Sequence, residues 1–173
     1  LYMAHGDYQV GMMLTENMIR AAATAVHGDA TVTFGDHTLD FASNFARYSM
    51  RDAVIKVGGL TAEQLDDVRI NATLKECGIA GCDDKSYGEK LLLLFEEKVE
   101  GQLIQPTFIT DFPVEVSPLA KRHEHNESLT ARFELFVAGM ELANAFSELN
   151  NPIDQAARFH EQTKARDAGD DEA

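Results

Sequence analysis

Three carboxylates and one amide that could bind a ligand lie in a largely apolar stretch, residues 132–150. They are Glu134, Glu141, Asn144 and Glu148. A carboxylate buried among apolar residues is costly unless a cation or hydrogen-bond donors meet it, so the stretch indicates a site that receives positive charge. Glu134 and Glu141 fall on neighbouring predicted strands, where they could share a divalent metal ion through oxygen ligands.

The spacing of the other polar residues suits a long cationic ligand. Side chains alternate between the two faces of a strand, so Asn144, Phe146 and Glu148 share one face. Asn144 could hold a polar end of the ligand, Phe146 could cover an aliphatic stem, and Glu148 could neutralise an ammonium group. Glu141 and Asn144 are an odd number of positions apart, so they face the same site only if a bulge or bend lies between them.

A simpler interpretation stays open when the residues are taken alone. Alternating glutamates on an antiparallel strand are typical of the solvated face of a half-buried sheet, and these residue types do not identify a ligand. His123 and His125 resemble a metal pair, but they lie in a polar stretch without further ligands. We expect both histidines to be solvent-exposed.

Composition narrows the class of protein. The chain carries 15 Lys and Arg against 29 Asp and Glu, a net charge of −14, which argues against a main phosphate-binding face but allows an acidic pocket for a cationic substrate. Cys77 and Cys82 lack the second ligand pair of a zinc site, so they are expected to be reduced thiols. The longest apolar runs are too short to span a membrane and no secretory leader is visible, so a cytoplasmic protein is expected.

The first half of the chain predicts a helix, a hairpin and then short helices. Asp7 can cap a helix over 8–26 that Gly28 ends, and strands over 31–34 and 37–41 flank a Gly-Asp turn. Helical patterns follow up to about residue 103. Their predicted N-terminal caps are Ser49, Thr61 with Gln64, and Ser86 with Glu89.

The second half predicts the strands that must hold the polar residues. These are 107–112, 131–138 and 140–149, with a polar loop over 121–128 and a final helix over 152–168. Strands at both ends with helices between them, and no regular strand–helix alternation, indicate an α+β fold built on an antiparallel sheet. Helices 8–26 and 152–167 are expected to pack outside that sheet.

Several runs of this sequence closely resemble the class II lysyl-tRNA synthetases of bacterial type. The runs are residues 104–113, 115–120, 132–136 and 141–150. Residues 1–4 and 166–173 look like the same family in the same order, and the likeness is weak only across 58–103. A match of this length is far more specific than a short motif. The resemblance implies the antiparallel sheet of a class II catalytic domain with a small helical insert.

The resemblance also implies a reaction, in which ATP activates lysine to lysyl-adenylate and the lysyl group passes to tRNA(Lys). The residues that match Glu134 and Glu141 would hold Mg²⁺ on the ATP phosphates. Catalysis in such a site is largely positioning and electrostatic relief of phosphate charge. Lysine, ATP and tRNA(Lys) are the partners expected for the parent enzyme, which would be a homodimer.

The same resemblance assigns the lysine pocket. The residues that match Tyr2 and Glu148 would recognise the ε-ammonium, and those that match Asn144 and Phe146 would line the pocket. The basic residues Lys121, Arg122 and His123 could contact tRNA or ATP, although an exposed loop without that role is expected. The acidic tail over 167–172 is expected to be a solvated linker.

The chain departs from the family pattern at one residue and in the motifs that it lacks. Position 140 is Met where bacterial members usually carry Arg. Motifs 1, 2 and 3, the ATP-binding arginines, the acid expected before Leu1 and the anticodon-binding domain are not found in the 173 residues. We therefore expect a piece between motifs 2 and 3 that is inactive alone. It would comprise a catalytic segment over 1–50, a helical insert over 51–104, and strands with a helix over 105–173.

Three other functions are possible for a chain with these residues. A non-catalytic synthetase-like binding module would retain the sheet without the reaction, and a reading frame starting near Leu1 would support it. A class II enzyme specific for aspartate or asparagine needs a cationic or amide partner where this chain has Glu148. A paralogue that lysylates a translation factor resembles the chain less through 146–150.

Overall fold

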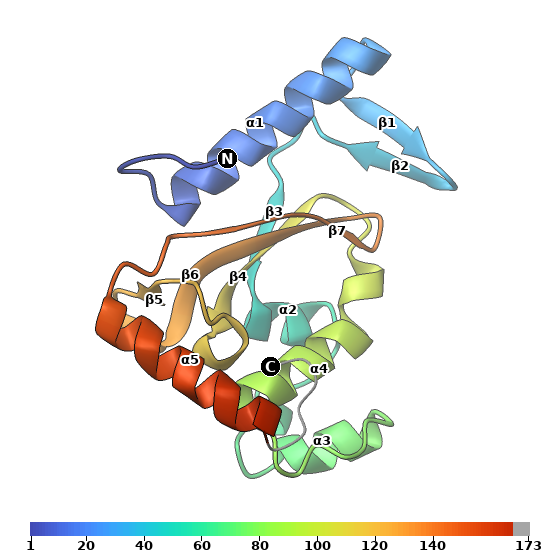
Figure 1. Ribbon diagram of the computed structural model, residues 1–173. Coiled ribbons are helices and arrows are strands. Elements are labelled where there is room, and N and C mark those ends of the chain that lie inside the picture. Colours follow the sequence, from blue (N-terminus) through green and yellow to red (C-terminus); the bar gives the residue numbers. More distant parts are fainter. Residues whose placement is uncertain (168–173) are drawn as a thin grey trace.

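The computed structural model describes residues 1–167, in which a curved sheet separates the first helix from the other helices (Figure 1). The helices and strands in chain order are α1 Tyr8–His27, β1 Thr31–Phe34, β2 His37–Asp40, β3 Ala46–Ser49, α2 Met50–Lys56, α3 Ile70–Glu76, α4 Tyr87–Lys98, β4 Thr107–Pro113, β5 Arg122–His123, β6 Asn126–Val137, β7 Met140–Phe146 and α5 Pro152–Asp167. Three 3₁₀ turns accompany them, namely η1 Glu63–Leu65, η2 Glu100–Gln102 and η3 Val114–Val116. The mixed α+β class predicted from the sequence is confirmed.

The main sheet is mostly antiparallel. Its order is β3-β4-β6-β5, and β7 also pairs with β6, while β1 and β2 form a separate hairpin. β3 pairs with β4 in parallel, a pairing that the sequence did not predict. A parallel pair needs a crossover between its strands. Here α2, α3 and α4 provide that crossover.

Alternation along the strands divides the core between the two faces of the sheet. Phe108, Phe133 and Leu135 pack with α1 residues on one face, and Ile109 and Phe136 pack with α2, α3 and α4 on the other. Figure 1 shows α1 and the hairpin on one side of the sheet and these three helices on the other. The helices of the predicted insert therefore share a core with β4 and β6. The division at residues 50 and 104 stays a prediction.

Most predicted helix caps are confirmed. The Asp7 side chain accepts from the Val10 amide, and Gly28 ends α1 with φ 76°. Ser49 caps α2, and Ser86 forms a capping box with Glu89 at the start of α4. Both hydrogen bonds expected between Thr61 and Gln64 are present, yet they begin only η1.

Two predicted boundaries in the second half are wrong. The predicted loop over 121–128 is a β-hairpin instead, because Arg122 and His123 pair with the first part of β6. β7 ends at Phe146 rather than at residue 149, although an isolated bridge still pairs Glu148 with Ala120. The final helix forms as predicted, and its last predicted residue and the acidic tail from 168 onward lie outside the described residues.

None of the helices within residues 1–167 is long and apolar enough to cross a membrane. Cys77 and Cys82 are free thiols, and Cys82 is buried.

Candidate functional site

A β-bulge in β7 places the polar residues of two strands on one face. Leu135 pairs with Ala143 and Phe136 pairs with Glu141, so Leu142 is an extra residue between them. An extra residue shifts the alternation of side chains by one position. Glu141 and Asn144 therefore face the same side despite their odd separation, and the predicted irregularity is confirmed.

Arg132 joins the two strands at the centre of this face. Its Nη2 donates to Glu134 Oε1 at 2.5 Å, and its Nε donates to Asn144 Oδ1 at 3.3 Å. The Asn144 amide in turn lies 3.4 Å from the same Glu134 oxygen. Glu134 and Asn144 are also direct cross-strand partners. One guanidinium therefore orients both a candidate metal ligand and a candidate lysine ligand.

The Arg132 guanidinium is itself held from the other side. Its Nη1 donates to Val116 O at 2.9 Å and to Ser117 Oγ at 2.8 Å. Its Cζ lies 4.5 Å from the centroid of the Phe112 ring, an arrangement that favours a cation. A planar guanidinium with this many partners has little freedom to leave Glu134.

The Glu134 carboxyl is buried beside two further acids, and Arg132 offsets only part of their effect on its pKa. The residue is 8% exposed. Burial, with smaller effects from Glu141 and Glu100, raises the pKa of its carboxyl from 4.5 to about 7, although Arg132 acts to lower it. The ionised form of Glu134 would thus gain from an additional cation.

Glu134 and Glu141 line the same small cavity, whose volume is about 270 Å³. Arg132 and two further acidic residues, Glu96 of α4 and Glu100 of η2, complete its polar lining. Within residues 1–167 no group of three or more His, Cys, Asp or Glu side chains is arranged to hold a metal ion. A Mg²⁺ ion commonly takes only one or two carboxylates and completes its shell with phosphate oxygens and water. The two glutamates fit that kind of ion.

Of the other predicted ligand residues, Asn144 and Phe146 lie on β7, whereas Glu148 and Tyr2 lie outside it. Phe146 is opposite Arg132 and half-buried, and Asn144 is exposed. Glu148 is exposed beyond the end of β7, where its backbone bridges to Ala120. Tyr2 is 89% exposed, and the described contacts do not join it to these residues. The ligand roles of all four stay predictions.

The sequence interpretation missed Arg132, Glu96 and Glu100. Arg132 shares the strand parity of Glu134, which was a usable signal for a charge partner two residues away. Glu96 and Glu100 gave no such signal, because their approach to Glu134 depends on how α4 packs beneath the sheet.

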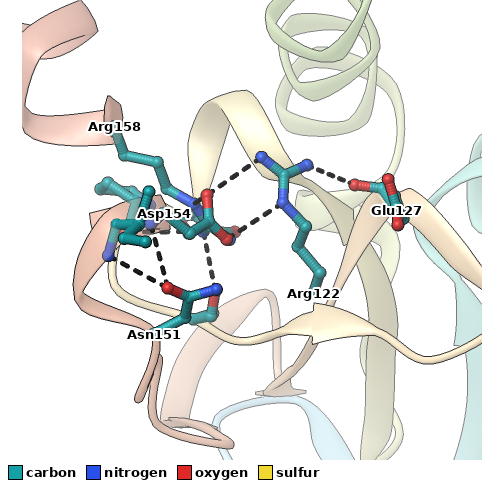
Figure 2. Close-up of polar contacts among 9 residues, drawn as sticks. Arg122, Glu127, Asn151, Asp154 and Arg158 are labelled. Carbon is teal, nitrogen blue, oxygen red and sulfur yellow. Dashed lines mark hydrogen bonds and ion pairs between the residues drawn. The ribbon is translucent and has the colours of Figure 1, made fainter. Parts of the chain in front are cut away.

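The expected exposed basic loop is also corrected. Arg122 forms an ion pair with Asp154 at 3.1 Å and donates to Glu127 O at 2.6 Å, as Figure 2 shows. His123 is half-buried, and its Nε2 lies 3.4 Å from the Tyr8 hydroxyl, whereas His125 is exposed as predicted. These partners fix the β5–β6 hairpin, so Arg122 is a structural residue here.

Comparison with known proteins places this geometry in a family. The family model described as tRNA synthetases class II (D, K and N) matches residues 1–173. Lysine–tRNA ligases from Oceanobacillus iheyensis, Pectobacterium carotovorum and Christiangramia forsetii are 47%, 46% and 44% identical to the chain. Each alignment covers 100% of this chain but only 35%, 35% and 30% of the respective relative. The chain thus spans about a third of the length of these curated relatives.

Proposed function

Because the chain belongs to the class II tRNA synthetases (D, K and N), we propose that the protein containing it is a lysine–tRNA ligase. Such an enzyme uses ATP to activate lysine as lysyl-adenylate and then transfers the lysyl group to tRNA(Lys). The observation that carries the proposal is the identity of 44–47% to lysine–tRNA ligases along the whole chain. The bulged strand that brings Glu134, Glu141 and Asn144 to one face agrees with it.

Glu134 and Glu141 would hold a magnesium ion together with the ATP phosphates. When bound, the ion would neutralise phosphate charge as pyrophosphate leaves. The protein's own part is to keep two carboxylates on one face of the sheet. The bulge at Leu142 turns the Glu141 side chain to the same face as Glu134. Arg132 fixes the carboxylate of Glu134 before any ligand binds. Preorganised charges of this kind need no rearrangement during the reaction.

Lysine would bind beside this cavity along β7 and its extension. Glu148 would accept hydrogen bonds from the ε-ammonium, and Phe146 would cover the methylene stem. Asn144 would bind the polar end, and Tyr2 would assist Glu148. A carboxylate that faces an ammonium gives a charge-assisted hydrogen bond, which is how the site would select lysine over uncharged amino acids of similar length.

Kinetics of the full-length protein test the proposal. Lysine, but not aspartate or asparagine, should drive ATP–pyrophosphate exchange. Truncating one partner of a desolvated charge pair costs roughly 2–5 kcal/mol, so Glu148→Gln should lower kcat/KM for lysine at least about tenfold. The KM for ATP should change little.

Glu124→Gln provides the matched control, because Glu124 is an exposed glutamate in the β5–β6 turn. That variant should behave like the wild type. Exchange driven by aspartate or asparagine instead of lysine would reject the proposed function. Unchanged lysine kinetics in Glu148→Gln would reject the role of Glu148 alone.

A further inference from the structure

Arg158 and Asp154 of α5 form a polar cluster with Arg122 of β5, outside the cavity of Glu134 (Figure 2). Arg158 is 8% exposed. Its Nη1 donates to Ser117 O at 3.1 Å and to Ala120 O at 2.7 Å. Its Nε and Nη2 donate to Asp154 at 3.1 and 2.9 Å. A buried guanidinium therefore anchors two backbone carbonyls of one short segment.

Asp154 is shared between Arg158 and Arg122. Arg122 donates to it through Nε at 3.1 Å and Nη2 at 3.2 Å. Hydrogen bonds from Arg158 and Arg122 hold the pKa of the Asp154 carboxyl at about 2. Asn151 also caps the first turn of α5, since its Oδ1 accepts from the Ile153 amide at 3.0 Å. The first turn of α5, the β5–β6 hairpin and the 117–120 segment thus form one connected unit.

The segment held by Arg158 is the backbone partner of Glu148. Lys121 N donates to Ser147 O at 2.8 Å, and Leu149 N donates to Leu119 O at 3.2 Å. Between these two bonds, Ala120 bridges Glu148. β7 ends at Phe146, and the last backbone bond to β6 is from Ser147 N to Ala131 O at 2.8 Å. Beyond that bond, the backbone of Glu148 and Leu149 is held by the 117–120 segment.

We propose that Arg158 and Asp154 are positioning residues that set the backbone of Glu148 through the 117–120 segment. The inference rests on the proposed function, in which Glu148 receives the lysine ε-ammonium. A displacement of about 1 Å in a binding group can change a rate by about 100-fold. A carboxylate at a strand end needs such support, because a site is only as accurate as the residues that hold its ligand groups.

The test uses Arg158→Lys and Asp154→Asn in the full-length protein. In Arg158→Lys the new side chain keeps the positive charge of Arg158. It lacks the planar guanidinium fork, so it cannot bind two carbonyls and a carboxylate at once. Each variant should raise the KM for lysine about tenfold and leave the KM for ATP within about twofold, as expected for a modest displacement.

Arg20→Lys is the matched control. Arg20 also pairs with an acid four residues earlier, Glu16, and donates to two loop carbonyls, Phe41 O and Ser43 O. It lies on α1, on the opposite face of the sheet from α4. Arg20→Lys can lower stability but should leave the KM for lysine unchanged.

A double variant separates positioning from a purely structural role. Residues that act through one another give non-additive effects, whereas independent sites add. Arg158→Lys introduced into Glu148→Gln should therefore change the KM for lysine no further. If Arg158→Lys does not yield folded protein, Asp154→Asn is carried through the same measurements.

Three results would overturn the inference. One is an unchanged KM for lysine in a folded variant, the second is an equal rise for lysine and ATP, and the third is an additive effect in the double variant. Each of these results counts only if the wild-type protein shows lysine-dependent ATP–pyrophosphate exchange. A wild type without lysine-dependent exchange would instead reject the proposed function.

Discussion

Replacing Arg132 with methionine should destabilise the sheet, and by an amount that depends on pH. Methionine is unbranched and uncharged, so Arg132→Met keeps part of the aliphatic stem and removes the charged partner of Glu134. The two side chains of the pair are only 16% and 11% exposed. Removing one member of a buried ion pair costs roughly 3–5 kcal/mol, because the other charge is left without compensation.

Protonation of Glu134 reduces this free-energy cost, because the neutral acid needs no cationic partner. Its pKa is about 7 in the folded chain against an ordinary value of 4.5. An acid with a raised pKa in the folded state binds its proton more tightly there, so its contribution to stability falls as pH rises from about 4.5 to about 7. Without Arg132 that pKa rises further, and the fall continues to higher pH. The free-energy gap between wild type and variant therefore widens as pH increases.

The expected loss is about 3–5 kcal/mol at pH 8.5. At pH 5.5 Glu134 is protonated in both proteins. The remaining loss is that of the Arg132 hydrogen bonds to Val116 O, Ser117 Oγ and Asn144 Oδ1, and it is smaller because no ionised carboxylate is left unpaired. Hydrogen exchange of β6 and β7 in the full-length protein, with EDTA and without ATP, measures the local free energy after correction for intrinsic rates. Equal losses at the two pH values, or no loss, would refute the reasoning.

Three further predictions concern the elements that hold the site. Phe133→Ala should cost about 3–5 kcal/mol in unfolding free energy, because Phe133 is fully buried and its ring packs edge-on against Phe108 at 5.2 Å; urea titration measures this. Gly88→Ala should destabilise the contact of α4 with the end of β4, since an added Cβ would lie 2.5 Å from Pro113 Cβ, and hydrogen exchange should quicken in α4 but not in α1. Asp154 has a lowered pKa, so its stabilising effect is present above about pH 4 and is lost as pH falls toward about 2; acid unfolding of Asp154→Asn should lack that component.

The sequence by itself determined the elements whose causes are local. Asp7, Ser49 and Ser86 cap their helices because a cap needs only amides two or three residues ahead. Strand parity required an irregularity between Glu141 and Asn144, and the bulge is there. The family was predicted from runs of residues that match it along the whole chain. Capping and strand parity alone could not have identified it.

The tertiary structure decided which distant groups meet. The Thr61 and Gln64 cap formed without an α-helix behind it, because the backbone becomes extended at Asp66, directly after the fully buried Leu65. Arg122 looked like part of an exposed basic loop, yet it pairs with Asp154, 32 positions away. Arg158 reaches Ser117 and Ala120 only because α5 returns along the β5–β6 hairpin. Alternation and capping depend on neighbours a few residues apart, whereas ion pairs between elements depend on the packing that brings those elements together, and no sequence period encodes it.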